Sequence, residues 1–184
     1  MLPAKAIVEI GAGSGTNFQF YPNQCALRCV EPKVEFKGYV DDSLKKRGEH
    51  LASVEFVQGT GELLSQIESI KPGSVDYVVC TLVLCSVKDV SKVIQEVKTV
   101  LKPAGKFYFL EHVYASESSK LVRICQNVIT PISKLLLDNC HHNREPWKAL
   151  ESAGFSSITY QRKSIAKASF ISPLRWLCVG IATK

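Results

Sequence analysis

The chain has 184 residues, a length that fits one domain, and its 46% hydrophobic and 22% charged content is ordinary for a globular protein. The net charge of +6 is spread along the chain without a basic block between aromatic residues, which argues against a nucleic-acid-binding protein. The seven cysteines are odd in number and form no C-x-x-C pair, which excludes a disulfide framework and indicates reduced thiols in a cytosol-facing compartment.

Strand and helix patterns alternate from end to end, which predicts an α/β layered fold. Apolar or alternating runs predict strands at residues 6–10, 27–31, 53–58, 75–80, 106–111, 156–162 and 177–183. Because only a short link joins the last two strands, we expect them to pair as an antiparallel hairpin beside otherwise parallel strands. Apolar spacing predicts a helix over 90–100, ended by Pro103 and Gly105, and a second helix from about Glu145 to Ala153.

Residues 113–143 have a different character. Apolar residues recur at helical spacing from Leu121 to Leu136, and Pro131 is expected to kink or split the segment. The segment is interpreted either as a core-facing helix pair or as a lid, a substrate wall or a surface that rests on a membrane.

Neither a metal site nor a membrane span is predicted. The stretch Cys140-His141-His142 lacks the second closely spaced Cys/His pair that a zinc site needs, so it is interpreted as a polar loop. No apolar run reaches the roughly 18 residues that a membrane-spanning helix needs.

The stretch IVEIGAGSGTNFQFYP, residues 7–22, places Gly11, Gly13 and Gly15 directly after a buried strand. Glycines at such a turn let a ligand approach the backbone, and the N–H groups of a following helix suit an anionic end. A pyrophosphate and the carboxylate of an amino acid both fit this geometry. The dinucleotide fingerprint G-x-G-x-x-G would need a glycine at position 16, where the chain has Thr16.

Two acidic residues help to choose between these ligands. Glu31 ends the second strand, twenty positions after Gly11, where a carboxylate accepts hydrogen bonds from ribose hydroxyls of either NAD or S-adenosylmethionine. Glu9, just before the glycines, disfavours a pyrophosphate by charge repulsion and favours a ligand with an ammonium and a sulfonium. The chain also offers no second domain for a hydride acceptor. The residues therefore favour S-adenosylmethionine.

These stretches resemble a known family. The glycine loop followed by CVEP at 29–32 resembles the opening of class I S-adenosylmethionine-dependent methyltransferases. The stretches VVCTLVLCSVKD (78–89), LKPAGKFYFLEHV (101–113) and REPWKALESAGF (144–155) resemble the methyltransferase-like thiol S-methyltransferases. Those are membrane-associated alkyl thiol methyltransferases of the endoplasmic reticulum and lipid droplets.

The resemblance implies a Rossmann-like three-layer sandwich with a seven-stranded, mostly parallel sheet of order 3-2-1-4-5-7-6 whose last strand is antiparallel. It implies S-adenosylmethionine over the carboxyl ends of strands one, two and four, with Glu31 at the ribose and Gly61 and Glu62 beside the adenine. The expected cofactor-binding residues are Glu9, Gly11, Ala12, Gly13, Gly15, Glu31, Pro32, Gly61, Glu62, Cys80, Thr81 and Leu82.

Two departures from the family pattern qualify this expectation. Thr60 stands where many class I enzymes have an aspartate that contacts the adenine. Residues 1–184 are expected to form a single methyltransferase domain without the family's N-terminal membrane anchor and cap helices, as in a truncated chain, a short isoform or an incomplete gene model. We then expect a more open cofactor site, weaker cofactor binding, and a cytoplasmic location in place of the endoplasmic reticulum or a lipid droplet.

The expected reaction is S-methylation of small alkyl thiols, in which positioning contributes most of the catalysis. Candidate general bases are His112, Glu111 and His141, with His142 beside it. The expected substrate walls are Leu82, Leu84, Phe109 and the segment 121–136. The expected partners are a small thiol substrate and, as a candidate, a membrane surface that residues 113–143 contact peripherally. The alternatives are a catalytically impaired adenosyl-binding or lipid-droplet interaction module and, third, a nicotinamide-dependent oxidoreductase.

Overall fold

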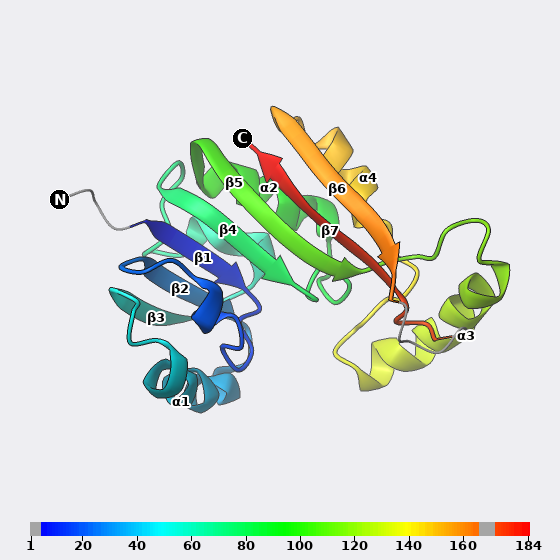
Figure 1. The fold of residues 1–184 in the computed structure, drawn as a ribbon, viewed down its shortest axis with the longest axis horizontal. Helices are drawn as coiled ribbons and strands as arrows, with labels where there is room; N and C mark the ends of the chain where they lie inside the picture. The colour runs from blue at the N-terminus through cyan, green and yellow to red at the C-terminus, as the bar shows by residue number, and fades with distance from the viewer. Residues whose placement is uncertain (1–4, 166–171) are drawn as a thin grey trace.

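A seven-stranded sheet organises the chain (Figure 1), and the computed structural model describes residues 5–165 and 172–184. The strands are β1 (Ala6–Ile10), β2 (Ala26–Glu31), β3 (Ser53–Gln58), β4 (Val75–Thr81), β5 (Leu101–His112), β6 (Ser157–Ser164) and β7 (Trp176–Thr183). Their order is β3-β2-β1-β4-β5-β7-β6, and β7 runs antiparallel to both of its neighbours while the other pairs are parallel. The predicted fold class and strand order are confirmed.

Within residues 5–165 and 172–184, four α-helices and three short 3-10 turns connect the strands. They are α1 (Lys37–Arg47), α2 (Val90–Val100), α3 (Lys120–Leu136), α4 (Pro146–Ser152), η1 (Phe18–Phe20), η2 (Val34–Phe36) and η3 (Gly61–Gln66). The predicted α2 begins at Asp89, whose carboxylate accepts the Lys92 N–H at 3.0 Å and so caps the helix. The sequence did not predict α1, because this helix buries only Val40 and Ser43 and has no apolar stripe.

Strand β5 begins earlier than predicted, directly after α2. It pairs with β4 at Leu101 and again from Lys106 onward, with a register shift opposite Val75 and Tyr77. The residues between these two pairings, Pro103 among them, form a bulge that does not pair with β4. Proline has no backbone N–H to donate, and at an unpaired position the sheet loses no hydrogen bond. The stretch from Pro103 to Gly105, which was predicted to end α2, therefore lies within β5.

The two faces of the sheet are covered unequally. Helices α2 and α4 and the η3 turn pack on one face and close a large core, in which Ile94, Phe107 and Leu150 are fully buried. Helix α1 and the η1 turn close a smaller core on the other face, over β1, β2 and β3. The β5–β7–β6 part of this second face has no covering helix within the described ranges 5–165 and 172–184.

Alternation along β5 shows the consequence. Phe107 and Phe109 point into the large core and are at most 3% exposed, whereas Tyr108 between them is 36% exposed on the uncovered face. On β7, Val179 and Ile181 are exposed in the same way. An apolar strip of sheet therefore faces outward beside the strand ends.

Helix α3 excludes one of its two predicted forms. It runs unbroken through Pro131, so the predicted split is wrong, and its apolar stripe faces outward, so a core-facing helix pair is also wrong. The stripe consists of residues that are each more than half exposed, namely Leu121, Ile124, Val128, Ile132, Leu135 and Leu136. The helix stands at one end of the molecule, away from the strands (Figure 1).

Polar side chains hold α3 in place. The Gln126 side chain, fully buried, accepts the Ala115 N–H at 2.9 Å and donates to the carbonyls of Val113 and Pro173, both at 2.9 Å. Ser133 lies on the same face of the helix, seven residues after Gln126, and its Oγ is 2.8 Å from Nε2 of the buried His142 ring. The buried face of α3 is thus the polar one, which places the helix by hydrogen bonds and leaves its apolar face free.

We expect Gln126→Leu to lower the free energy of unfolding by about 2–5 kcal/mol, because three buried backbone groups lose their partners at once. Urea denaturation followed by circular dichroism measures this loss, and hydrogen exchange should show that the α3 amides lose protection first. The matched control is Val128→Ala on the exposed stripe, which should change stability by no more than about 0.5 kcal/mol. Unchanged protection of α3 in Gln126→Leu would contradict the anchoring role.

Candidate functional site

The sheet order places the carboxyl ends of β1, β2 and β4 side by side, and the glycine loop leaves β1 at this edge. Gly11, Gly13 and Gly15 all have positive φ, at 65°, 51° and 71°. A Cβ at Gly11 would lie 2.3 Å from Val83 Cγ2, and one at Gly15 would lie 2.8 Å from the Phe18 ring. A Cβ at Gly13 would meet nothing within 4 Å. Two of the glycines thus permit close packing, and the third borders open space that a ligand can fill.

Glu31 joins the glycine loop to the end of β2. Its carboxylate is 6% exposed, and it accepts the Gly13 N–H at 3.2 Å and the Lys33 N–H at 3.3 Å. Pro32, the next residue, is exposed. The carboxylate therefore lies at the border of the open space over Gly13, where hydroxyl donors of a ligand can reach it.

Glu9 lies beneath this loop and is only 1% exposed. Its Oε1 accepts from Asn17 Nδ2 at 2.7 Å, and the same amide donates to Thr81 Oγ1 at 3.2 Å. Burial raises the pKa of Glu9 to about 7, although hydrogen bonds from Asn17 and Tyr21 oppose the shift. The group carries only part of a negative charge at pH 7, so it repels a pyrophosphate less than the sequence argument assumed.

Asn17 is a site residue that the sequence reasoning missed. It ties β1 to the end of β4 through Glu9 and Thr81, and so fixes the far side of the glycine loop. Asparagine is common in turns, so its presence two positions after Gly15 gives no sign of a special role. Its side chain contacts Thr81 only because the end of β4 lies beside the glycine loop. Only the folded chain supplies that information.

The residues predicted after β4 separate into two groups. Cys80 is fully buried, with its Sγ 3.3 Å from Glu111 Oε1, and so its side chain belongs to the core. Thr81 is half-buried at the strand end, and Leu82 is 43% exposed with φ at 60°. Leu82 donates its N–H to Leu110 O at 2.7 Å, which fixes its outward direction. Thr81 and Leu82 are the two that border the site.

Glu111 lies inside the protein rather than in the site. Its side chain is fully buried, and Oε1 also accepts the Val83 N–H at 3.0 Å. Burial is the main cause that raises the pKa of Glu111 to about 8, so the carboxyl is largely protonated at neutral pH. A buried acid that holds its proton is a poor general base, and its contacts instead position the loop at Val83.

Gly61 and Glu62 also have structural partners. Gly61 is buried, and a Cβ there would lie 3.0 Å from Ile10 Cγ2 and 3.1 Å from Val93 Cγ1. Glu62 Oε1 accepts the Lys88 N–H at 2.8 Å in the loop before α2. Ala12 is 5% exposed within the smaller core, so only its backbone is open to a ligand.

The loop at residues 137–144 reaches across the strand ends. Lys33 after β2 pairs with Asp138 at 2.5 Å, and the Arg144 guanidinium donates to Leu84 O and Val87 O at 2.8 and 2.7 Å. The exposed ion pair contributes little stability. These contacts nevertheless place the loop between the ends of β2 and β4, although it is distant from both in the sequence.

This loop carries His141. Its Nδ1 lies 2.7 Å from Asn139 O and 3.3 Å from Cys85 O. Two carbonyl oxygens place the proton on Nδ1 and leave Nε2 as an acceptor. Burial, and then the Arg144 charge, lower the pKa of His141 below its ordinary 6.5, so the ring is neutral at pH 7.

The other two histidines offer less. His112 Nδ1 is buried without a hydrogen-bond partner in the described part of the chain, and burial lowers the pKa of this ring. The His142 ring is 2% exposed and is held by Ser133. Among the three, the ring of His141 is the one whose acceptor nitrogen is available beside the β4 loop.

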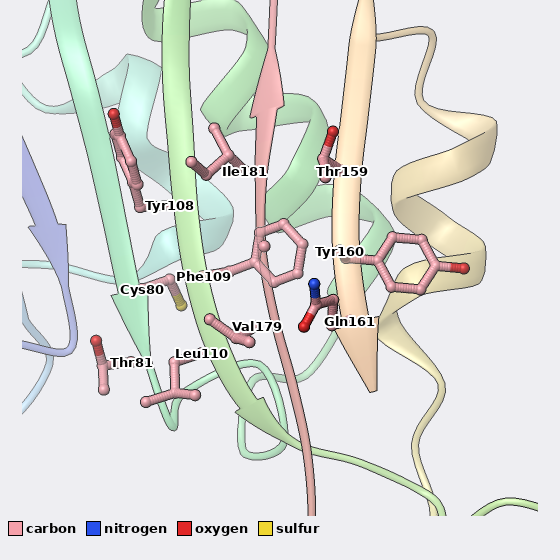
Figure 2. Close-up of a pocket in the computed structure, with 11 residues that line it drawn as sticks. Cys80, Thr81, Tyr108, Phe109, Leu110, Thr159, Tyr160, Gln161, Val179 and Ile181 are labelled. Carbon is pink, nitrogen blue, oxygen red and sulfur yellow. The ribbon is translucent and has the colours of Figure 1, made fainter. Parts of the chain in front are cut away.

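A shallow hollow of about 420 Å³ opens on the uncovered face of the sheet (Figure 2). It begins at Thr81 and Leu110 and continues past Tyr108, Val179 and Ile181, and none of the described residues that line it is charged. It lies beside the strand ends rather than over the glycine loop, and it suits an apolar group. Of the four walls expected for an apolar substrate, Leu84 is wrong, because it is fully buried in the large core, whereas Phe109 is one of the residues that line the hollow.

The comparisons agree with this geometry. The sequence profile of the family described as "Methyltransferase domain" matches residues 8–109, more than half of the chain. The chain belongs to this methyltransferase family. The matched part contains the glycine loop, Glu31 and the β4 end, which together form the site described above. Within the described residues there is no group of three or more His, Cys, Asp or Glu side chains suited to a metal ion.

Thiol S-methyltransferases are among the relatives of this methyltransferase. Human thiol S-methyltransferase TMT1A is 42% identical over 171 residues, which cover 93% of this chain and 65% of the relative. Human thiol S-methyltransferase TMT1B is 42% identical over 175 residues, which cover 95% and 67%. The chain thus spans about two thirds of the length of these curated relatives.

A solved structure agrees in fold. A Thermotoga maritima protein, described as an SAM-dependent methyltransferase and possible histamine N-methyltransferase, superposes with a TM-score of 0.68. The superposition covers all of this chain and 84% of that one, at 22% identity. At this identity the likeness shows the fold alone.

The site of this methyltransferase fits S-adenosylmethionine. Gly13 borders open space with its backbone, and the Glu31 carboxylate at the same border accepts hydrogen bonds. Neither feature offers the basic side chain that a pyrophosphate would favour.

We expect Glu31→Ala to raise the Kd for S-adenosylhomocysteine about tenfold to a hundredfold, because the ligand loses a charge-assisted acceptor and Gly13 loses its tether. Isothermal titration calorimetry measures this Kd. Glu35→Ala, which removes an exposed acid four residues further along, is the control and should leave the Kd within about twofold. An unchanged Kd in Glu31→Ala would remove Glu31 from the cofactor site.

Proposed function

We propose that this chain is an S-adenosylmethionine-dependent methyltransferase that methylates the sulfur of small alkyl thiols. The observation that carries the proposal is the identity of about 40% to thiol S-methyltransferases along 93–95% of the chain. The apolar hollow beside Thr81 supports a small apolar substrate over a sugar or a nucleotide. The fit of the glycine loop and Glu31 to an adenosyl ligand supports the cofactor.

Each part of the site has a role in this proposal. When bound, S-adenosylmethionine supplies an activated methyl group on a sulfonium. The backbone at Gly13 and the carboxylate of Glu31 hold the cofactor, while Glu9 and Asn17 keep the glycine loop in shape. Thr81 and Leu82 border the reacting end, and holding the thiol there supplies the orientation on which the rate depends.

We propose that Nε2 of His141 accepts the proton of the substrate thiol. The carbonyls of Asn139 and Cys85 keep the proton of the resting ring on Nδ1, so Nε2 is the basic nitrogen. A thiol with a pKa of about 8.5 is only a few per cent ionised at pH 7, so a neutral imidazole raises the thiolate fraction. Glu111 and His112, the other candidate bases, act in this proposal on the loop and the core rather than on the substrate.

The direct test is to supply the chain with S-adenosylmethionine and a small alkyl thiol and to detect the methyl thioether by mass spectrometry. We expect His141→Gln to lower kcat/KM at pH 7 about tenfold to a hundredfold, a modest effect because a thiol is already a strong nucleophile. The wild-type rate should fall as the pH drops through the lowered pKa of His141, where Nε2 is protonated. The variant's rate should instead follow the thiolate fraction of the substrate, about tenfold per pH unit below the substrate pKa.

Two controls make this test specific. An aryl thiol that is already ionised at neutral pH should react equally well with the wild type and with His141→Gln. His50→Gln, at the opposite edge of the sheet, should leave both substrates unaffected. Equal losses with both thiols would show a structural role for His141. Cofactor binding without any methylation of thiols would favour the alternative function, an adenosyl-binding module.

We also propose that the exposed stripe of α3 rests on an anionic lipid surface, such as the endoplasmic reticulum or lipid-droplet surface that the family resemblance implies. The helix carries Lys120, Arg123 and Lys134 and no acidic residue, so its charge complements an anionic surface beside an apolar stripe. Within the described residues, no helix has the length and apolarity to cross a membrane. The proposed contact is therefore peripheral.

We expect Leu135→Glu to weaken binding to vesicles that contain phosphatidylserine by about tenfold or more, since it places a charge where an apolar side chain would enter the lipid. Sedimentation with vesicles measures the bound fraction. Val34→Glu, at another exposed apolar position, is the matched control and should bind as the wild type does. Wild-type dimers with no vesicle binding would instead assign the stripe to a second copy of the chain.

A further inference from the structure

Two cysteines distant in the sequence meet beside the β4 loop. The Sγ atoms of Cys85 and Cys140 lie 3.6 Å apart, although 55 positions separate the residues. Cys85 is 3% exposed, whereas Cys140 is only partly buried. This is the one thiol–thiol contact among the described cysteines, and nothing in the proposed methyl transfer uses it.

The two loops that carry these thiols are held together independently of them. The His141 N–H donates to Cys85 O at 2.9 Å, and Asn139 Nδ2 donates to Ser86 O at 2.9 Å. Arg144 adds its two bonds to the carbonyls of the same loop. The approach of the two sulfurs is therefore set by a backbone arrangement on both sides.

We propose that Cys85 and Cys140 form a thiol–disulfide modification site that reacts with a low-molecular-weight disulfide such as glutathione disulfide. A disulfide needs the sulfurs at about 2.05 Å, so they must approach by about 1.5 Å, which side-chain rotation and a small loop shift can supply. The paired loops are already in contact, so no rearrangement of the sheet is needed.

Cys140 is the more exposed of the two thiols, so it reacts with glutathione disulfide first and Cys85 reacts second. The thiolate of Cys140 attacks one sulfur of glutathione disulfide, forms a mixed disulfide and releases one glutathione thiolate. Cys85 then loses its proton and attacks Cys140 Sγ, which releases the second glutathione. Both cysteine protons end on the two glutathione thiols, and the two cysteines are oxidised as glutathione disulfide is reduced. The hydrogen bond between the two thiols supports the first step, because it lowers the pKa of Cys140 below its ordinary value.

The bond would lock the loop that shapes the site. Residues 82–87 carry Leu82, which borders the site, and Val83, which packs on Gly11 and donates to Glu111. A covalent tie to Cys140 would join this loop to the loop that carries His141. Any effect on thiol methylation rests on the proposed function, whereas formation of the bond does not.

The experiment incubates the native chain in glutathione buffers of rising disulfide-to-thiol ratio. We expect the intact mass to fall by two hydrogens, and a non-reducing peptide map to show a peptide that links Cys85 to Cys140. The melting temperature should rise by roughly 5–15 °C, because the link closes a long loop of the unfolded chain. Dithiothreitol should reverse both changes.

The control variant is Cys125→Ser, which removes another partly exposed thiol, on α3, and should behave as the wild type does. Cys140→Ser should show neither the mass change nor the rise in melting temperature. Alkylation of the native wild type by N-ethylmaleimide gives a second readout that needs no variant, since oxidation should protect Cys140, the accessible thiol of the pair. A stable glutathione adduct on Cys140 without the link, or a link that forms only in the unfolded chain, would overturn the proposal.

Discussion

The close packing of Val83 against the bare backbone of Gly11 is the contact on which the site depends. A side chain at Gly11 would overlap Val83, so glycine there lets the loop after β4 lie directly against the loop after β1. The Val83 N–H is in turn held by the buried carboxyl of Glu111. This one approach sets the distance between the proposed cofactor end and the proposed substrate end of the site.

Buried acids stabilise this arrangement as hydrogen-bond acceptors more than as charges. Burial raises the pKa of Glu9 to about 7 and that of Glu111 to about 8, so neither carries a full charge at neutral pH. Glu31, which lies at the open space over Gly13, is the acid placed to meet a ligand. The three glutamates thus divide into two that shape the loops and one that lies where we propose the cofactor binds.

The segment after β5 reverses the usual arrangement of an amphipathic helix. Its polar residues, Gln126 and Ser133, face the protein, and its apolar stripe faces outward. The loop that follows crosses the strand ends and brings both His141 and Cys140 to the β4 loop. Lipid contact, proton transfer and thiol oxidation are all proposed for this one segment, and a change in one is therefore expected to influence the others.

The sequence by itself determined the strand positions, helix α2, the glycine loop and the acid at the end of β2. It did so because the periodicity of apolar residues, the spacing of glycines and the presence of capping residues are local properties. The family resemblance added the strand order and the thiol chemistry. The sequence did not predict α1, whose surface is almost wholly polar. It left open whether the stripe of α3 faces the core or the outside, since a periodic stripe has the same spacing whichever way it points.

Only the tertiary structure decided which predicted residues face the site. Cys80, Leu84 and Glu111 lie in the core, because alternation along β4 and β5 and the packing of α2 and α4 bury them, whereas Thr81 and Leu82 remain at the edge. The Asn17 bridge and the Cys85–Cys140 pair join positions 64 and 55 residues apart. Contacts between such distant positions depend on how parallel strands and their loops stack in space, which no local pattern in the sequence records.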